Sequence, residues 1–420
     1  MSVPTRPLGE VARLLSGGTP RKSNADYWRG AIPWLTPKDM ARWENQTEAH
    51  VSEQAIGNGT RLAPPNASFV AVRGMSLHNE IRVVSSSRPI TFNQDIKAVV
   101  AGPDLNAAFL YYALTAAKPI LLNSVSAAGH GTGVLATDRL LALPIPVFPP
   151  TVQRAVAIFL GDIDDKIELN RRMNETLEAQ ARALFRDWFV DFGPVKAKMA
   201  GDTPYLAPDL WSLFPNRLDD DGVPEGWKRS TVGASFDLTM GQSPPGDTYN
   251  DDGEGLPFFQ GRTDFGFRYP QNRKYCDAPK RVAEAEDTLV SVRAPVGDIN
   301  LAWEKSCVGR GVAALRHKSG SPSFTYYSAA ALRSELEIYQ HTGTVFGAIN
   351  KKQFEALKTV EPGVAVLKAF DELAGPIDQK IRTNETECRT LTRTRDLLLP
   401  KLMSGEIRVG EVSSKELSAA

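Results

Sequence analysis

The feature that most constrains the fold of this 420-residue chain is a pair of long heptad patterns. In each pattern, residues recur in alternating steps of four and three, and the two patterns keep a constant offset of 214 residues. A period of about 3.5 residues winds helices into a left-handed coiled coil, where each such residue inserts between residues of a partner helix. The two series are Ile163, Ile167, Asn170, Asn174, Leu177, Ala181, Leu184 and Trp188, and Ile377, Ile381, Asn384, Cys388, Leu391, Arg395, Leu398 and Leu402.

Either pattern alone is equally typical of an ordinary amphipathic surface helix. Two copies in register favour two long helices that contact one another. Polar residues within the patterns, such as Asn170, Asn174 and Asn384, are common devices for fixing the register and partner of a coiled coil. If the helices pair antiparallel, the chain acquires a pseudo-twofold internal repeat.

The segments that precede the two helices also repeat, but their offset drifts, as it does when loops of different length separate common elements. The matches are Leu14–Pro20 with Leu238–Pro244 and Ile32–Trp34 with Leu256–Phe258, both at an offset of 224, and Val72-Arg73 with Val292-Arg293 at 220. The residue pattern predicts strands at Ser68–Arg73, Ile96–Val100, Thr288–Arg293 and Gly311–Leu315, and helices at Leu105–Ala117 and Ser323–Ser334.

These patterns predict an α+β protein in which two mixed α/β domains are separated by two long antiparallel coiled-coil helices. The expected order is a first globular domain at 1–150, a helix at 151–191, a linker at 192–224, a second globular domain at 225–365, a helix at 366–408 and a tail at 409–420.

Composition narrows the possible functions. The 49 basic and 49 acidic residues balance, which argues against non-specific coating of nucleic acid and requires any DNA-binding surface to be local. The longest apolar stretch, Ala107–Leu122, is interrupted by Lys118-Pro119 and is too short to cross a bilayer. Three scattered cysteines and the lack of an N-terminal signal pattern fit a reducing cytoplasm.

The sequence contains no recognisable catalytic motif. There is no phosphate-binding loop of the GxxxxGK[ST] type, and the five histidines are isolated in sequence. No cysteine or histidine cluster has metal-ligand spacing. We therefore expect no catalytic residues, no metal and no cofactor in this chain.

Two similar domains joined by two similar helices favour sequence recognition. Paired DNA readers recognise two half-sites about one helical turn apart. Because the two copies differ, the expected target is asymmetric and split, and the helices would set the gap between its halves. A coiled-coil scaffold with two protein-binding domains is the alternative, but it gives no reason for paired and diverged copies of one domain.

Several segments resemble the specificity (S) subunits of Type I restriction–modification systems. Lys166–Phe189 is similar to their central conserved region, and Leu397–Ile407 is similar to their C-terminal conserved region. Ser16–Pro20, Ile32–Asp39 and Leu143–Pro146 resemble recurring marks of their target recognition domains. The usual Pro-x-x-Glu-Gln entry to the helix departs from the pattern here, as Pro150-Thr-Val-Gln153 and, in the second copy, as Glu361–Ala365.

The resemblance implies a non-catalytic subunit that binds double-stranded DNA. It also implies assembly with two adenine methyltransferase (M) subunits and with restriction/translocase (R) subunits. S-adenosylmethionine, ATP and Mg²⁺ would bind those partners. The helices would dock the M subunits, and the exposed residues Arg171, Arg172, Arg382 and Arg393 are either part of that surface or simply solvated charges.

Base readout requires Arg or Lys for guanine and Asn or Gln for adenine, and basic groups contact phosphates. Trp34 and Phe258, at matched positions, are interpreted as core residues rather than base-stacking residues. The candidate DNA-binding residues are Arg21, Lys22, Lys38 and Arg73 in the first domain, and Gln260, Arg262, Arg293, Lys351 and Lys352 in the second.

Overall fold

A computed structural model describes residues 3–43, 45–128, 131–341 and 347–411. The chain forms two compact units. Unit 1 comprises Met1–Arg171 and Glu385–Ala420, and unit 2 comprises Arg172–Asn384. Most of the tail predicted at 409–420, from residue 412 onward, lies outside the described residues.

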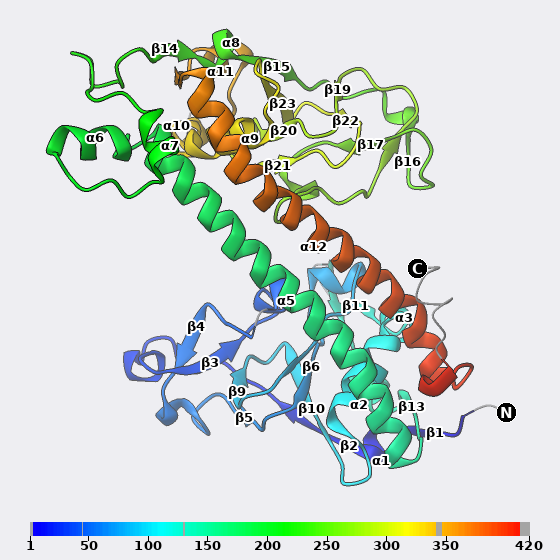
Figure 1. Cartoon of the computed structure of the whole chain (residues 1–420). Coiled ribbons are helices and arrows are strands. Elements are labelled where there is room, and N and C mark those ends of the chain that lie inside the picture. The colour runs from blue at the N-terminus through cyan, green and yellow to red at the C-terminus, as the bar shows by residue number, and fades with distance from the viewer. Residues whose placement is uncertain (1–2, 44, 129–130, 342–346, 412–420) are drawn as a thin grey trace. The chain divides into compact units, whose positions relative to one another are not determined.

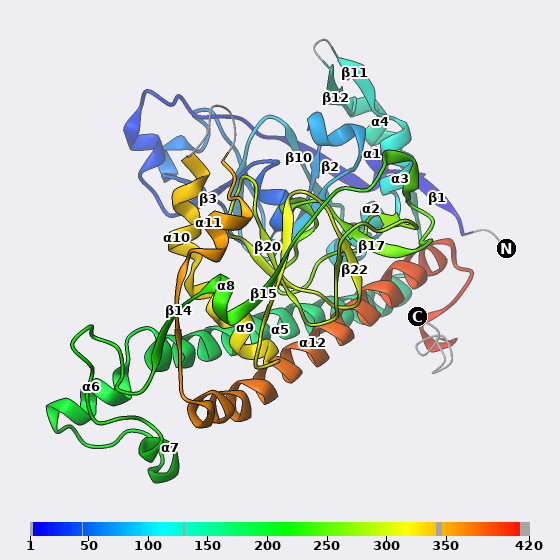
Figure 2. The same ribbon diagram turned by 90° about the horizontal axis from the view of Figure 1, so that it is seen from above.

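Two long helices contribute residues to both units: α5 (Pro150–Phe189) and α12 (Val364–Ser404). Figures 1 and 2 show them running side by side. Their first residues are 214 positions apart. The eroded motif at Glu361–Ala365 therefore still begins a helix where the first copy does.

The helix pairing in unit 1 is antiparallel. The Asp164 carboxylate lies 2.7 Å from an Arg395 nitrogen, the Ile167 carbonyl accepts from Cys388 Sγ at 3.6 Å, and the Asn170 amide donates to Glu387 at 2.8 Å, so the partner number on α12 falls as the number on α5 rises. Burial of the Cys388 thiol in this contact raises its pKa.

Unit 2 contains the same kind of helix contact. The Asn384 amide donates to Asn174 Oδ1 at 2.8 Å, and both side chains are almost fully buried. Ile381 is completely buried beside them. An asparagine pair of this kind favours one register, because a shifted helix would leave two amides in the core without partners.

Unit 1 is built on an antiparallel sheet with the strand order β2 (Ala12–Ser16), β10 (Ile96–Ala101), β6 (Ala67–Ala71) and β8 (Val83–Ser86). A second sheet has the order β4 (Ala49–Val51), β3 (Ile32–Leu35), β9 (Ile90–Phe92) and β5 (Leu62–Ala63), with β3 and β9 parallel. The remaining elements are β1 (Thr5–Pro7), β7 (Arg73–Gly74), β11 (Ser126–Ala128), β12 (Thr132–Val134), β13 (Pro144–Pro146), α1 (Leu8–Val11), α2 (Ala107–Ala116), α3 (Lys118–Asn123) and α4 (Thr137–Leu141).

Unit 2 repeats this topology. Its first sheet has the order β15 (Phe236–Met240), β23 (Val312–His317), β20 (Thr288–Ser291) and β21 (Ile299–Leu301). Its second sheet has the order β16 (Tyr249–Asn250), β18 (Tyr275–Cys276), β17 (Leu256–Phe259), β22 (Ser306–Val308) and β19 (Val282–Ala283), with β17 and β22 parallel. The other strands and α-helices of its α/β domain are β14 (Lys228–Thr231), β24 (Lys358–Glu361), α8 (Val232–Ser235), α9 (Pro322–Ala331), α10 (Arg333–Glu337) and α11 (Lys351–Glu355).

The matched elements confirm the predicted α+β class and internal repeat. The offset between first residues is 224 for β2 and β15, 216 for β10 and β23, and 214 for α5 and α12. The drift has therefore ended by β13 and β24, which also match at an offset of 214 and directly precede the helices. Trp34 and Phe258 are both buried in strand-associated clusters, which confirms their interpretation as core residues.

The segment predicted as a linker at 192–224 is more ordered than its composition indicates. It forms α6 (Gly193–Ala200) and α7 (Pro208–Ser212). Val195, Phe214 and Val223 from this segment pack in the same core as Trp188 of α5. The proline and glycine content indicated where helices break, but burial of these apolar side chains holds the segment in place.

Each unit attaches its α/β domain to the long helices through a tyrosine–aspartate hydrogen bond. In unit 1, the Tyr112 hydroxyl of α2 donates to Asp164 of α5 at 2.8 Å. In unit 2, the Tyr327 hydroxyl of α9 donates to Asp378 of α12 at 2.7 Å. Burial beside the carboxylate raises the pKa of both hydroxyls, so both remain neutral donors.

Unit 2 adds a buried cation to this attachment. Arg268 is 2% exposed and pairs with Asp378 at 2.6 Å and with Glu178 at 3.5 Å. Its guanidinium stacks on Tyr326 at 3.6 Å from the ring centroid. Burial alone would lower the pKa of Arg268, but the surrounding tyrosines and carboxylates raise it well above its ordinary value. The side chain is therefore a permanently charged link between the domain and both helices.

We predict that Asp378→Ala destabilises the chain by about 3–5 kcal/mol, because Arg268 would keep its buried charge but lose its closest carboxylate. Chemical denaturation of the purified chain would measure this. Lys368→Ala, which breaks an exposed 3.9 Å pair with Glu372 on the same helix, should cost less than about 1 kcal/mol. Similar losses for both variants would contradict this role of the buried pair.

Candidate nucleic-acid interface

Four turns of unit 2 are joined by backbone hydrogen bonds into one surface, called here the loop platform: residues 241–243, 260–261, 292–294 and 309–311. Gln242 N donates to the Val308 carbonyl at 3.0 Å, and Gly309 N donates to the Phe259 carbonyl at 2.9 Å. The Gly311 N–H donates to the Gln260 carbonyl at 3.1 Å, and its own carbonyl accepts from Val292 N at 2.9 Å. The turns are therefore held by main chain, which leaves their side chains available.

Unit 1 contains the same loop platform at residues 17–19, 36–37, 72–74 and 93–95. Gly18 N donates to the Phe92 carbonyl at 2.9 Å, as its counterpart Gln242 does. Asn93 N donates to the Leu35 carbonyl at 3.0 Å, and Val72 N donates to the Asp95 carbonyl at 2.8 Å. Three of the four backbone bonds named for unit 2 are thus repeated in unit 1, although most side chains differ.

A carboxylate closes the turn after the parallel strand in each platform. The Asp39 carboxylate accepts from Thr36 N at 2.8 Å in unit 1. The Asp264 carboxylate accepts from Gln260 N at 2.9 Å in unit 2. The backbone of the first residue of each turn, Thr36 or Gln260, is therefore fixed by a hydrogen bond.

Close packing explains the glycine at the first position of each platform. A Cβ on Gly241 would lie 2.2 Å from the Gly309 carbonyl oxygen and 2.5 Å from that of Val312. A Cβ on the matched Gly17 would lie 2.2 Å from the Asn93 carbonyl oxygen. Only glycine allows the chain to approach this closely.

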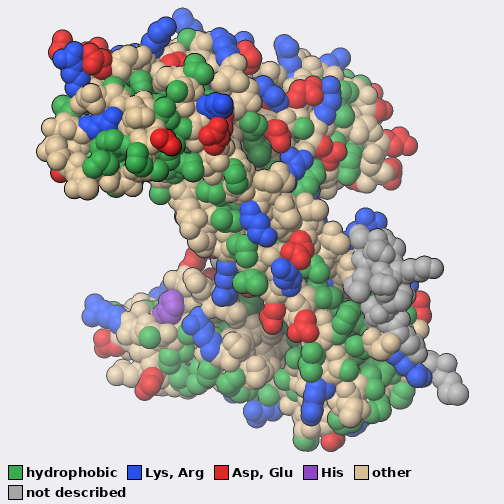
Figure 3. All heavy atoms as spheres, in the orientation of Figure 1, with side chains coloured by type: hydrophobic (Ala, Val, Ile, Leu, Met, Phe, Trp, Pro, Cys, Tyr) green, Lys and Arg blue, Asp and Glu red, His purple; other side chains and the backbone are tan. Residues whose placement is uncertain are grey.

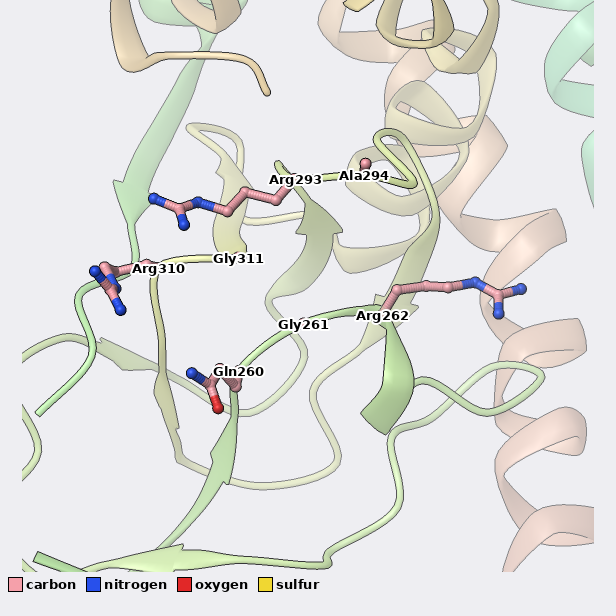
Figure 4. A pocket seen from close by; sticks show the side chains of 7 residues that line it. All are labelled: Gln260, Gly261, Arg262, Arg293, Ala294, Arg310 and Gly311. Carbon is pink, nitrogen blue, oxygen red and sulfur yellow. The ribbon is translucent and has the colours of Figure 1, made fainter. Parts of the chain in front are cut away.

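The platform of unit 2 contains a small pocket of about 140 Å³, whose lining residues are Gln260, Gly261, Arg262, Arg293, Ala294, Arg310 and Gly311. Figure 4 shows Arg293 and Arg310 extending toward the same side, whereas Arg262 extends the opposite way. Arg262 forms an ion pair with Asp298. In the described part of the chain, the Arg293 and Arg310 guanidiniums form no ion pair, so this side of the pocket carries uncompensated positive charge.

Three of the sequence-predicted cations are already in ion pairs. Arg262 pairs with Asp298, Lys38 with Glu48 at 2.6 Å, and Lys351 with Glu355 at 3.5 Å. The hydrogen bond and charge of Glu48 raise the pKa of Lys38. Such exposed pairs contribute little to stability, so a phosphate could replace the carboxylate at small cost.

The other predicted cations are exposed near the platforms. Arg21 and Lys22 follow the turn at 17–19 in sequence. Arg73 pairs in register with Val134, and its counterpart Arg293 bridges to Ala348 in the same way. Lys352 lies beside the ion-paired Lys351 in the first turn of α11.

Sequence reasoning missed two exposed platform residues, Gln94 and Arg310. They occupy matched turns of the two units: Gln94 lies between β9 and β10, and Arg310 lies between β22 and β23. The first residues of these strands match at an offset of 216. The offset of 216 differs from the offsets of 224, 220 and 214 that are evident in the sequence, so Gln94 and Arg310 do not align there. The short glycine-flanked sequence Gly309-Arg-Gly311 was the available signal.

The heptad residues of the long helices are buried or half-buried in their units.

Figure 3 shows acidic and basic side chains intermixed on the visible face of each unit, in agreement with the neutral net charge. Among the described residues, no cluster of His, Cys, Asp and Glu could hold a metal ion. No described helix is both long and apolar enough to span a membrane. The seam and docking candidates are Ile163, Ile167, Asn170, Asn174, Leu177, Leu184, Trp188, Ile377, Ile381, Asn384, Leu391, Leu398 and Leu402.

We predict that Gly241→Ala displaces the platform of unit 2 and lowers the stability of the chain by about 1–3 kcal/mol, because its new methyl group would overlap backbone oxygens. Thermal unfolding of the purified chain would measure the loss. Gly246→Ala is the matched control, since its Cβ would meet nothing within 4 Å. Equal melting temperatures for the two variants would show that the platform is not closely packed.

Comparisons with known proteins show what the chain is similar to. Residues 3–179 match the model of the Type I restriction modification DNA specificity domain. The chain is 32% identical over 275 residues to a candidate MjaX specificity subunit of a type I restriction enzyme from Methanocaldococcus jannaschii; this match covers 64% of the chain and only 61% of that relative. It is 25% identical over 425 residues to the MjaIX type I specificity subunit of the same organism, covering 96% and 93% of the two chains.

A solved structure supports the fold. The S subunit of a Type I restriction-modification system from M. genitalium aligns with a TM-score of 0.55 at 16% identity, covering 95% of each chain. This likeness concerns the fold alone. The chain is thus similar to Type I restriction–modification specificity subunits, in sequence over residues 3–179 and in fold over nearly its whole length.

Proposed function

We propose that this chain selects the DNA sequence on which a Type I restriction–modification complex acts. The observation that carries the proposal is the duplicated loop platform, in which the same backbone bonds present different side chains in the two units. Two copies of one surface with different side chains suit a target whose two halves have different sequences. The target would therefore be asymmetric and split.

The chemistry of the platforms suits duplex DNA. Exposed arginines such as Arg73 and Arg293 can contact phosphates, and Gln94, Gln260 and Arg310 can contact base edges. Because the net charge of the chain is zero, this binding would depend on the local charge of the platforms rather than on a general attraction. A scaffold that binds proteins would not require glycine-packed turns with uncompensated arginines.

Methylation and cleavage would belong to other subunits. We infer that the paired long helices dock two methyltransferase subunits and, through them, restriction subunits. S-adenosylmethionine, ATP and Mg²⁺ would be bound by those partners, and this chain would be non-catalytic. The complex would act on DNA in the cytoplasm.

We predict that exchanging residues 1–150 for the corresponding domain of another specificity subunit changes one half of the methylated motif and leaves the other intact. The reason is that each platform lies within one unit. Methylome sequencing of a host that carries the complete system, with the original or the exchanged gene, would measure this.

The unexchanged gene and a deletion strain serve as controls in that experiment. A deletion strain that keeps every methylated motif would contradict the proposed function. A change in both half-sites after the exchange would contradict the assignment of one half-site to each unit.

A further inference from the structure

The two platforms of one chain can be compared position by position, and this comparison separates the roles of their side chains. Phosphates are the same in every half-site, whereas the bases differ. Residues that contact phosphates can therefore be identical in both units, and residues that read bases must differ if the half-sites differ. Arg73 and Arg293 are identical at matched positions, and Gln94 and Arg310 differ.

We propose that Gln94 and Arg310 are specificity-determining residues, each reading one base pair in the half-site of its own unit. This inference rests on the proposed function and deepens it. Arg310 would read guanine, because a planar guanidinium can donate two parallel hydrogen bonds to guanine O6 and N7. Gln94 would read adenine, because an amide can accept from N6 and donate to N7.

The position of Arg310 suits base readout. Its turn joins β22 to β23, and its backbone N–H donates to the Ser243 hydroxyl at 3.2 Å. Gly309 and Gly311 flank it, and both are hydrogen-bonded to the neighbouring turn. The backbone is therefore fixed while the side chain is exposed beside the pocket (Figure 4).

Gln94 contacts the matched hydroxyl residue too, but through its side chain rather than its backbone. The hydroxyl of Thr19, the counterpart of Ser243 at an offset of 224, donates to Gln94 Oε1 at 2.6 Å. A carbonyl oxygen accepts two hydrogen bonds, so Oε1 retains one site for a base amino group. Its amide nitrogen makes one long contact, 3.4 Å to Asp95, and keeps a second N–H for a base acceptor.

Arg73 and Arg293 take the phosphate role in this scheme. Arg73 follows the inner strand β6, and Arg293 follows the matched strand β20. Each pairs with a matched segment of its own unit, Arg73 with Val134 and Arg293 with Ala348. Their position at the edge of the platform, one hydrogen-bonded turn away from residues 94 and 310, suits contact with the DNA backbone beside the base that is read.

The test uses the specificity chain reconstituted with its methyltransferase subunits and a library of randomised duplex DNA. The wild-type complex defines the target and its two half-sites. Arg310→Lys keeps the charge but loses the two parallel donors, so it should lower the preference for guanine at one position by about 10- to 100-fold. Arg310→Gln should shift that same position toward adenine.

The reciprocal variant Gln94→Arg should change one position of the other half-site from adenine toward guanine. Arg293→Gln is the matched control: it should weaken binding to all sequences alike and reduce the magnitude of the salt-dependence slope, d log K/d log [salt], by about one. Thermal melting of each variant should match that of the wild type, because residues 94, 293 and 310 are exposed.

The outcomes separate the inference from the function on which it rests. A wild-type complex with no sequence preference would overturn the proposed function. A wild-type complex with a clear target, whose base preferences stay unchanged in Arg310→Lys, Arg310→Gln and Gln94→Arg, would overturn this inference alone. The same holds if a variant alters both half-sites or weakens every sequence equally.

Discussion

The structure depends on the antiparallel pairing of two helices that are far apart in sequence. Each unit takes one half of α5 and the opposite half of α12, so neither unit is complete without this pairing. Buried polar contacts, such as the Asn174–Asn384 amide pair, favour one register over its neighbours. A tyrosine–aspartate hydrogen bond then ties each α/β domain to the helices. Register and attachment together determine where each loop platform lies in its own unit.

The duplication made much of this fold predictable from sequence. Heptad spacing depends only on local periodicity, so the first residues of the helices, Pro150 and Val364, lie within two residues of the predicted starts, whereas Ser404 ends α12 four residues before the predicted end at 408. The buried ion pair of Arg268 was not predictable, because its partners Glu178 and Asp378 lie on different helices and no local pattern joins them. The order of the segment at 192–224 was missed for a similar reason, since Phe214 is held by tertiary contacts.

The candidate interface shows the same limit. Arg73 and Arg293 follow predicted strands at a recognisable offset, and the structure gives them matched partners. Gln94 and Arg310 escaped notice because insertions between the strands had shifted their offset to 216. Sequence also could not show that Arg262 turns away from Arg293 toward Asp298, because that direction depends on a contact 36 residues away. Side-chain direction is a property of packing rather than of composition.

The division of the chain into units has a consequence for its synthesis on the ribosome. Unit 2 is one continuous stretch, so it can close its core as soon as Asn384 has emerged. Unit 1 must wait for the C-terminal half of α12, whose Leu398, Leu399, Leu402 and Met403 complete its hydrophobic core. The first domain to be translated is therefore the last to be finished, and until then the apolar surface that α12 covers stays exposed.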